Sequence, residues 1–478
     1  MKNKIIYILS GLVLLVTACN KQSLTPVPTT SISDLSAYNT PDRILNQVSG
    51  LYASMRSGNF YGGRFVIYND IRAEEFINEL TNGVTGLEVW NETVNNNTNN
   101  VTALWSQAYY VINLCNVFLD GMASKGNSVV GDALAKNYNA EAKFVRALSY
   151  YSLLQLYARP FADGSGSKPG LPLRLTGNTG AGNYDLARSS VADVYKQILD
   201  DLNFAETNLP LTYTTAALNT NRAHRNTAIA IKTRVYLNMQ NYASVITEAN
   251  KIVSTAAPFT ATSGVPHALN PDIISVFRPP YTSTESILSM PFNANETPGT
   301  QNQLGYYYSK STGNGEYSLN PNGIIADPNW KSTDARRGFN AVVAGKPYLD
   351  KKYSAPSPYT DWVPVIRYSE VLLNLAEALA RTNAAVDARA LALVNAVRKR
   401  SDPTTTLVAA TQTDLINLIL TERRIEFLGE GLRSPDLLRL LLPLPAKSNV
   451  AAVPPTAQLY IWPISATELL LNRLMTDN

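Results

Sequence analysis

The chain has 478 residues, with 41 lysines and arginines, 37 aspartates and glutamates, and a formal net charge of +4 at pH 7. A nucleic-acid-binding protein usually carries a strong basic excess, so this balance argues against nucleic acid as a partner. The two cysteines in the sequence do not suffice for a disulfide framework or a cysteine-based metal cluster.

The first 18 residues form a predicted signal peptide. Lys2 and Lys4 precede a short apolar run, from Ile5 to Val16, which is too short to span a bilayer. The run ends in Leu15 to Cys19, an apolar-x-small-Cys pattern that is typical of bacterial lipoproteins. In that class the cysteine is lipidated and becomes the new amino terminus, and several acyl chains anchor it stably. The alternative is a plain secreted protein with a cysteine at this point.

Residues 19–40 are predicted to be the lipidated Cys19 and a flexible tether, because Ser, Thr and Pro are frequent there. No apolar run beyond the signal peptide approaches transmembrane length. We therefore expect the protein to reach the membrane through the lipid on Cys19.

Helical patterns occupy both ends of the mature chain, at about residues 41–255 and 366–478. Thr40 before Pro41 is a typical helix start. Cys115 lies on a helical pattern and is expected to be a buried apolar residue. The spacing of apolar residues predicts helices at about residues 41–57, 101–122, 134–157, 191–207, 228–239, 242–253, 367–381, 386–400 and 415–429.

Several of these helices are predicted to form antiparallel pairs of tetratricopeptide type. The clearest pair runs from Arg234 to Tyr236 and then from Tyr242 to Ala249, where large and small apolar residues alternate. Such repeats stack into a superhelix whose extended surfaces commonly bind another protein. Because the spacing is irregular, a non-repetitive helical domain stays open. The predicted class is mainly α, a tetratricopeptide-like scaffold with a long loop-rich insertion.

The insertion covers about residues 256–365, is rich in Pro, Gly and Asn, and contains a few short predicted strands such as Ser286 to Met290. Ordered loops of this length are usually functional. Their aromatic rings can stack on the C–H face of a sugar, or they can fill a small core beneath the loops. We expect two or three to face solvent and bind ligand. The aromatic residues are Tyr281, Tyr306, Tyr307, Tyr308, Tyr317, Trp330, Tyr348, Tyr353, Tyr359 and Trp362, and the chosen candidates are Tyr306, Tyr307, Tyr308, Tyr317 and Trp330.

A second candidate surface runs from Tyr68 to Asn91, where polar and aromatic residues interleave without a helical period. Trp90 is the candidate for stacking, and Asp70, Arg72 and Asn91 are the candidates for hydrogen bonding. The alternative is a helix-capping loop and a solvated turn. A ligand is expected to lie between this surface and the insertion.

Four segments in order resemble the signatures of the SusD/RagB family, the surface lipoproteins of nutrient-uptake systems in Bacteroidetes. The resemblance covers nearly the whole mature chain and indicates one domain over residues 41–478. The segments are Asn139 to Tyr151, Arg367 to Ala378, Glu422 to Arg433 with Asp436 to Arg439, and the ending from Trp462.

The resemblance implies a non-catalytic outer-membrane protein, anchored through Cys19, that captures oligosaccharides and passes them to a SusC-like TonB-dependent transporter. Peptide capture, as in RagB-like members, and a helical scaffold that binds only the transporter are the alternatives. The protein is expected to face the cell exterior. Surface lipoproteins of these bacteria often carry acids after the lipidated cysteine, whereas no acid precedes Asp34 here, so orientation stays open.

The carboxylates of the late helices are interpreted as structural. Glycoside hydrolysis needs two carboxylates across a cleft, about 5 Å or about 6.5–9.5 Å apart. Glu426, Glu430 and Asp436 instead lie among Arg423, Arg424 and Arg433 in a helical pattern, and Glu370 and Glu377 share one helix face. With two isolated histidines and no Ser-His-Asp signature or phosphate loop, we expect no catalysis and no cofactor. A structural Ca²⁺ stays open, although no motif supports it.

Overall fold

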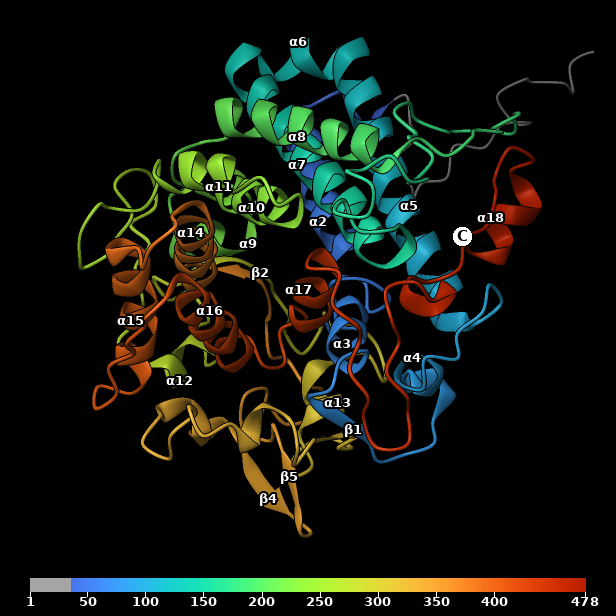
Figure 1. Cartoon of the computed structure of the whole chain (residues 1–478). Coiled ribbons are helices and arrows are strands. Elements are labelled where there is room, and N and C mark those ends of the chain that lie inside the picture. The colour runs from blue at the N-terminus through green and yellow to red at the C-terminus, as the bar shows by residue number, and fades with distance from the viewer. Residues whose placement is uncertain (1–35) are drawn as a thin grey trace, which may run out of the picture.

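The computed structural model describes residues 36–478. The predictions for the signal peptide, for Cys19 and for the tether up to residue 35 lie outside these residues. In Figure 1 the long helices fill the upper part of the molecule, and the short strands and turns of the insertion lie below them. No helix within residues 36–478 combines the length and apolar character needed to cross a bilayer.

The predicted helices are present, with ends shifted by a few residues. Thr40 Oγ1 accepts a hydrogen bond from the amide of Arg43, as its predicted capping role requires. The first half contains α2 Pro41–Met55, α3 Arg64–Ile71, α4 Leu87–Trp90, α5 Asn99–Gly121, α6 Asn127–Val130, α7 Asp132–Tyr157, α8 Val191–Asn208, α9 Ala216–Asn221, α10 Arg225–Asn238 and α11 Tyr242–Ala249. The second half contains α14 Tyr368–Thr382, α15 Ala388–Ser401, α16 Gln412–Glu426, α17 Arg433–Arg439 and α18 Ala466–Leu471.

Successive helices pack in pairs, α7 with α8, α10 with α11, and α14 with α15 (Figure 1). A buried ion pair joins two neighbouring pairs, because Arg234 of α10 contacts Glu370 of α14 at 2.6 Å. The predicted class is therefore confirmed: the described chain is mainly α, with stacked helix pairs and a few short strands.

Between α11 and α14 the described elements are short. They are α12 Ile273–Val276, β2 Ser286–Met290, α13 Leu304–Tyr308, β3 Tyr317–Leu319, β4 Ala341–Val343, β5 Lys346–Tyr348 and β6 Val363–Arg367. The strand predicted at Ser286 is confirmed as β2, which pairs antiparallel with β6. Strand β4 pairs with β5, and β3 pairs with β1 (Phe76–Asn78), so that the insertion lies against the segment containing α3 and α4.

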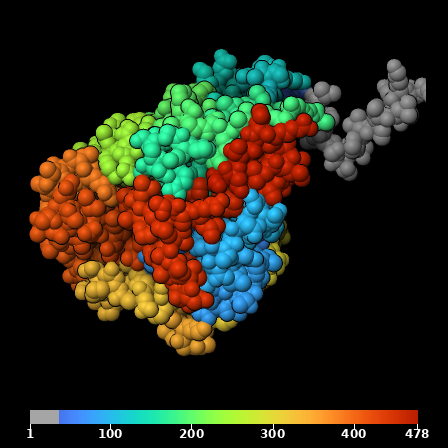
Figure 2. All heavy atoms as spheres, turned by 45° about the vertical axis from the view of Figure 1, so that its right-hand side comes forward, coloured from blue at the N-terminus to red at the C-terminus, as the bar shows by residue number. Residues whose placement is uncertain are grey.

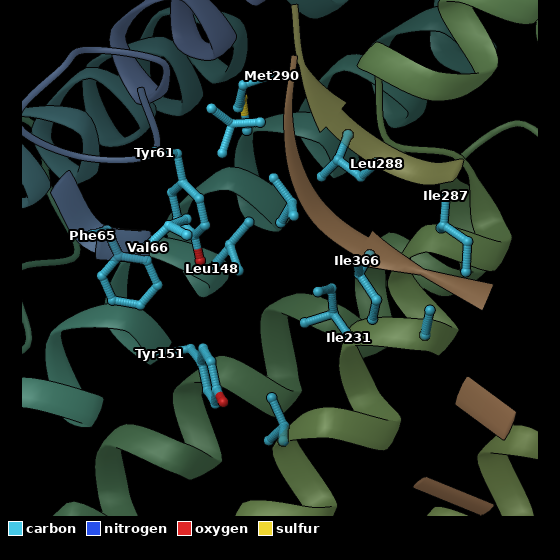
Figure 3. Packing of buried hydrophobic residues seen from close by; sticks show 14 of the residues in the cluster. Tyr61, Phe65, Val66, Leu148, Tyr151, Ile231, Ile287, Leu288, Met290 and Ile366 are labelled. Atoms are coloured by element: carbon cyan, nitrogen blue, oxygen red, sulfur yellow. The ribbon is translucent and has the colours of Figure 1, made fainter. Parts of the chain in front are cut away.

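A continuous hydrophobic core joins the helices to the insertion. Figure 3 shows Tyr61 and Leu148 from the helical side facing Leu288 and Ile366 of the β2–β6 pair. Cys115 is fully buried in the same core, as expected. Burial of this apolar surface is the main favourable term that holds the insertion on the helices.

A buried network of ion pairs makes the second connection between insertion and helices. Arg367, at the end of β6, contacts Glu285 of the insertion. Its guanidinium also contacts two carboxylates from the helical side, those of Glu426 in α16 and of Glu430, at 2.8 Å in both cases. Each charge in the network has an opposite partner, and every side chain involved is at most 5 % exposed. The members are the cations Arg336, Lys352, Arg367, Arg398 and Arg400 and the anions Glu285, Asp334, Glu422, Glu426 and Glu430.

We predict that Arg367→Ala lowers the free energy of unfolding by about 3–5 kcal/mol, because it leaves buried carboxylates without their partner. The matched control is Lys196→Ala, which removes a solvent-exposed pair with Asp200 and should leave the free energy of unfolding nearly unchanged. Urea denaturation of the three proteins measures the difference. Equal effects of the two substitutions would contradict a structural role for the network.

Candidate ligand-binding site

The surface predicted between residues 68 and 91 is largely interior. Helix α3 lacks an amphipathic period because it is buried on all sides, and Asp70, Arg72 and Trp90 are at most 5 % exposed. Arg72 contacts Glu92 at 3.3 Å and donates to the carbonyls of residues 459 and 460, while the indole nitrogen of Trp90 donates to the Phe76 carbonyl at 2.8 Å. These three side chains hold chain segments together, and the expectation that they form an exposed surface is wrong.

Asn91 differs from its neighbours because it stays half-buried at the surface. It lines an open cleft of about 690 Å³ together with residues 449–459. Its proposed role in hydrogen bonding to a ligand therefore stays a prediction.

Asp70 has an unusual buried position. Its Oδ2 accepts a hydrogen bond from the hydroxyl of Tyr308 at 2.8 Å. Burial raises the pKa of Asp70 to about 8, although the hydrogen bonds from Tyr308 and from the amide of Gly431 oppose this rise. The carboxyl group is thus neutral in the folded protein through most of the acidic range.

Four of the aromatic candidates in the insertion are also buried. Tyr307 stacks on Tyr317 with ring centroids 6.1 Å apart, Tyr308 stacks on Phe76 at 4.9 Å, and Trp330 is covered by the guanidinium of Arg337. The expectation that these rings face solvent is wrong. The insertion has few regular elements, so its large rings supply the apolar surface for its own core.

Four other rings reach the surface, and we name them the loop aromatic cluster: Tyr281, Tyr306, Tyr359 and Trp362. Each is partly exposed. Tyr281 stacks on Trp362 with centroids 5.5 Å apart and planes inclined by 19°. Tyr306 meets Tyr359 edge to face at 5.9 Å. Four rings of the insertion are thus partly exposed, where two or three were expected to face solvent, and only Tyr306 among them is a chosen candidate; ligand binding by this set stays a prediction.

Asp361 and Gly305 bring the two ring pairs together. Asp361 accepts hydrogen bonds from the hydroxyl of Tyr281 at 3.3 Å and from the amide of Ala355 at 2.9 Å. Gly305 lies against both Asp361 and the Tyr359 ring, since an added Cβ would be 3.3 Å from the Asp361 carboxylate and 3.6 Å from that ring. An added Cβ would be tightest against the Tyr353 carbonyl, at 3.1 Å, so a glycine suits this close approach.

Polar groups and backbone geometry fix the rings in place. The hydroxyl of Tyr306 accepts from the side-chain amides of Gln301 at 3.4 Å and Asn314 at 3.2 Å. Tyr281 and Tyr359 each have φ near +61°, a conformation that a non-glycine residue keeps only where its surroundings determine it. The cluster therefore combines preset aromatic faces with amides and a carboxylate.

Tyr281, Tyr359 and Trp362 were not among the chosen candidates. A signal for two of them exists in the sequence, because Tyr281 directly follows Pro280 and Tyr359 directly follows Pro358. Proline cannot donate to a ladder, so such positions fall at the ends of regular structure, where a ring can reach the surface. Trp362 has no comparable signal.

The late-helix carboxylates are paired, as interpreted from the sequence. Glu377 contacts Arg439 at 2.6 Å, and Asp436 contacts Arg423 at 2.8 Å. Burial alone would raise the pKa of Asp436, but the two arginines Arg423 and Arg439 hold it at about 2. These carboxylates are charged structural partners and do not face each other across a cleft.

The histidines are not isolated, contrary to expectation. His224 and His267 stack with centroids 5.3 Å apart in the core. Burial lowers the pKa of His224 to about 3, and the neighbouring His267 contributes to this shift. Burial also lowers the pKa of His267, to about 4. Among residues 36–478, no group of three or more His, Cys, Asp or Glu side chains could hold a metal ion.

Comparison with known proteins relates both halves of this chain to SusD-like proteins. The family model described as "SusD family" matches residues 281–449, and one described as "Starch-binding associating with outer membrane" matches residues 33–237. A SusD superfamily protein of Bacteroides fragilis, known from a crystal structure, is 30% identical with a TM-score of 0.81, covering 92% of this chain and 100% of that chain.

Two further relatives agree with these matches. A SusD superfamily protein of Bacteroides thetaiotaomicron shares the fold at 22% identity with a TM-score of 0.81, covering 92% of this chain and 99% of that chain. A SusD-like protein of Formosa agariphila is 25% identical and covers 91% of each chain. The chain belongs to the SusD/RagB family.

We predict that the free energy of unfolding of the wild type falls, relative to Asp70→Asn, as pH rises from about 4 to about 8. The Asp70 carboxyl ionises near pH 4 in the unfolded chain but only near pH 8 when folded, so folding takes up a proton between these values. The slope is about 1.4 kcal/mol per pH unit.

Urea denaturation at pH 5, 6, 7 and 8 measures this difference, which should grow in favour of Asp70→Asn. Asp200→Asn changes an exposed aspartate in a solvated pair and is the control that should follow the wild type at each pH. Parallel curves for wild type and Asp70→Asn would show that Asp70 is ionised in the folded protein.

Proposed function

We propose that this protein is a non-catalytic binding protein that captures oligosaccharides at the cell surface and passes them to a SusC-like TonB-dependent transporter. The observation that carries the proposal is the loop aromatic cluster, which presents four partly exposed rings, held in place by amides and a carboxylate, in a member of the SusD/RagB family. Rings of this kind stack on the C–H faces of sugars, and neighbouring polar groups bind their hydroxyls.

The absence of catalysis is supported by the state of the acidic residues. Cleavage of a glycosidic bond requires one carboxylic acid and one carboxylate that face the same substrate. Glu422, Glu426 and Glu430 are instead saturated by cations in the interior. Asp361 in the cluster accepts hydrogen bonds from Tyr281 and Ala355, which suits a positioning role for that carboxylate.

Anchoring and partnership rest on the sequence and the family. The apolar-x-small-Cys pattern that ends at Cys19 would provide a lipid anchor. The family model that matches residues 33–237 is described as associating with the outer membrane. An outward orientation and delivery to a transporter follow from the role proposed for the ligand site. The stacked helix pairs offer an extended surface for a protein partner.

We predict that Tyr359→Ala weakens oligosaccharide binding about two- to ten-fold, because it removes one ring of the cluster, worth about 0.5–1.5 kcal/mol. Tyr359→Phe is the matched control, since it keeps the ring and the Tyr359 hydroxyl has no hydrogen-bond partner among the described residues. Calorimetric titration with maltoheptaose, xylohexaose, laminarihexaose and a peptide mixture measures the affinities, and Trp362→Ala extends the test to the second ring pair.

Each outcome of the titration distinguishes the proposal from an alternative. Glycan binding that is weakened by Tyr359→Ala and kept by Tyr359→Phe, with no product formed, supports it. Binding of peptides alone favours the RagB-like alternative, and an absence of all binding favours a scaffold for the transporter. Release of shorter sugars would contradict a non-catalytic role.

A further inference from the structure

A separate cleft of about 740 Å³ opens beside the C-terminal helix. Its walls come from α5, from the segment 174–185 that follows α7, and from α18 with Asn472 and Arg473. Figure 2 turns this side forward, where the C-terminal segment (red) borders the green segment. The volume lies in the range of about 300–1,000 Å³ that small-molecule sites occupy.

The walls of the cleft are held in place without a ligand. The Asn113 side chain of α5 donates to the Asn178 carbonyl at 3.0 Å and accepts from the Asn178 amide at 2.8 Å. The Asn472 side chain makes the same reciprocal pair with the backbone of Leu186, at 2.8 and 2.9 Å. Arg174 adds an ion pair with Glu468 of α18 at 3.0 Å. A site fixed in this way loses little freedom when it binds.

Several polar groups in the cleft remain available. Three groups in the lining make no hydrogen bond within residues 36–478. They are the side-chain amide of Asn178, the side-chain nitrogen of Asn183 and the guanidinium of Arg473. Asp185 uses one carboxylate oxygen to accept from the Arg473 backbone at 2.7 Å, and its other oxygen has no partner in the same range. Donors and acceptors therefore converge on one space from three parts of the chain.

An aromatic face borders the same space. Tyr184 is 39 % exposed, and its hydroxyl donates to the Gly180 carbonyl at 2.6 Å, which fixes the ring. The lining charges balance, because Arg174 and Arg473 are matched by Glu468 and Asp185.

We propose that this cleft is a second glycan-binding site, which takes a neutral oligosaccharide. A sugar hydroxyl both donates and accepts, which suits the mixed free groups of Asn178, Asn183 and Asp185. The Tyr184 ring supplies a stacking face for a sugar. Because the charges of the lining balance, the cleft does not favour an anionic ligand over a neutral one. The inference rests on the proposed function for its ligand class. Two sites on one chain raise the retention of a glycan long enough, or branched enough, to meet both.

Calorimetric titration of the purified protein with maltoheptaose, xylohexaose and laminarihexaose tests the proposal. We expect two molecules of the bound glycan per protein chain. Tyr184→Ala and Asn178→Ala should each weaken binding at one of the two sites about ten-fold and leave the affinity of the other site unchanged. Both side chains are at the surface and outside the core, so the fold should be kept. Tyr110→Ala removes a tyrosine that is 55 % exposed and is not part of the lining, and it should leave two sites.

The outcomes separate this inference from the proposed function. A single site whose affinity falls in Tyr359→Ala but is unchanged in Tyr184→Ala overturns the second site and leaves the proposed function intact. A single site whose affinity falls in Tyr184→Ala but is unchanged in Tyr359→Ala supports this cleft and overturns the role of the loop aromatic cluster. Binding of none of the three glycans overturns the second site, and peptide binding in that case would leave a capture role for the protein with another cargo.

Discussion

The mutual neutralisation of buried charges around Arg367 is the constraint on which the rest of the structure depends. Moving a charged side chain out of water costs several kcal/mol, and the cost is offset only where each partner stands in place. Glu285 and Asp334 from the insertion and Glu422 and Glu426 from α16 share the same arginines. These shared arginines join the insertion to α16 at fixed points, and they hold its loops in position although the loops have little regular structure of their own.

The same constraint explains how rings are divided between the interior and the surface. Once the insertion is docked, its inner layer must be apolar, and Tyr307, Tyr308 and Tyr317 form that layer. The loop aromatic cluster is the outer layer of the same structure. Tyr306 and Tyr307 are neighbours in α13 and contact each other edge to face, yet only Tyr306 reaches solvent. The interior and the surface thus use the same residue type at adjacent positions.

The predictable part of the fold is the part with a period. Helices such as α2 and α8 bury one face at helical spacing and lie within two residues of their predicted ends, and matched charges in the late helices indicated ion pairs. Helix α3 is buried on every side and shows no period, so it was missed. The directions of aromatic rings in loops follow no period either. For this reason the sequence did not indicate that four candidate rings are buried: Tyr307, Tyr308, Tyr317 and Trp330. The cleft at α18 was not foreseen, because contacts such as Asn472 with Leu186 join distant segments.

The pairing of β1 with β3 affects the order in which the chain can acquire its structure. Phe76 in β1 lies opposite Leu319 in β3. The buried ion-pair network that holds the insertion also needs Glu426 and Glu430, which pair with Arg367 and come late in the chain. Contacts at such long sequence separation slow folding, because loop closure must come before they form. A chain that is synthesised from its amino terminus would leave the contacts of its first half incomplete until α16 is made. Incomplete chains would then expose the tyrosines and apolar strands of the interior, which makes them targets for chaperones and proteases.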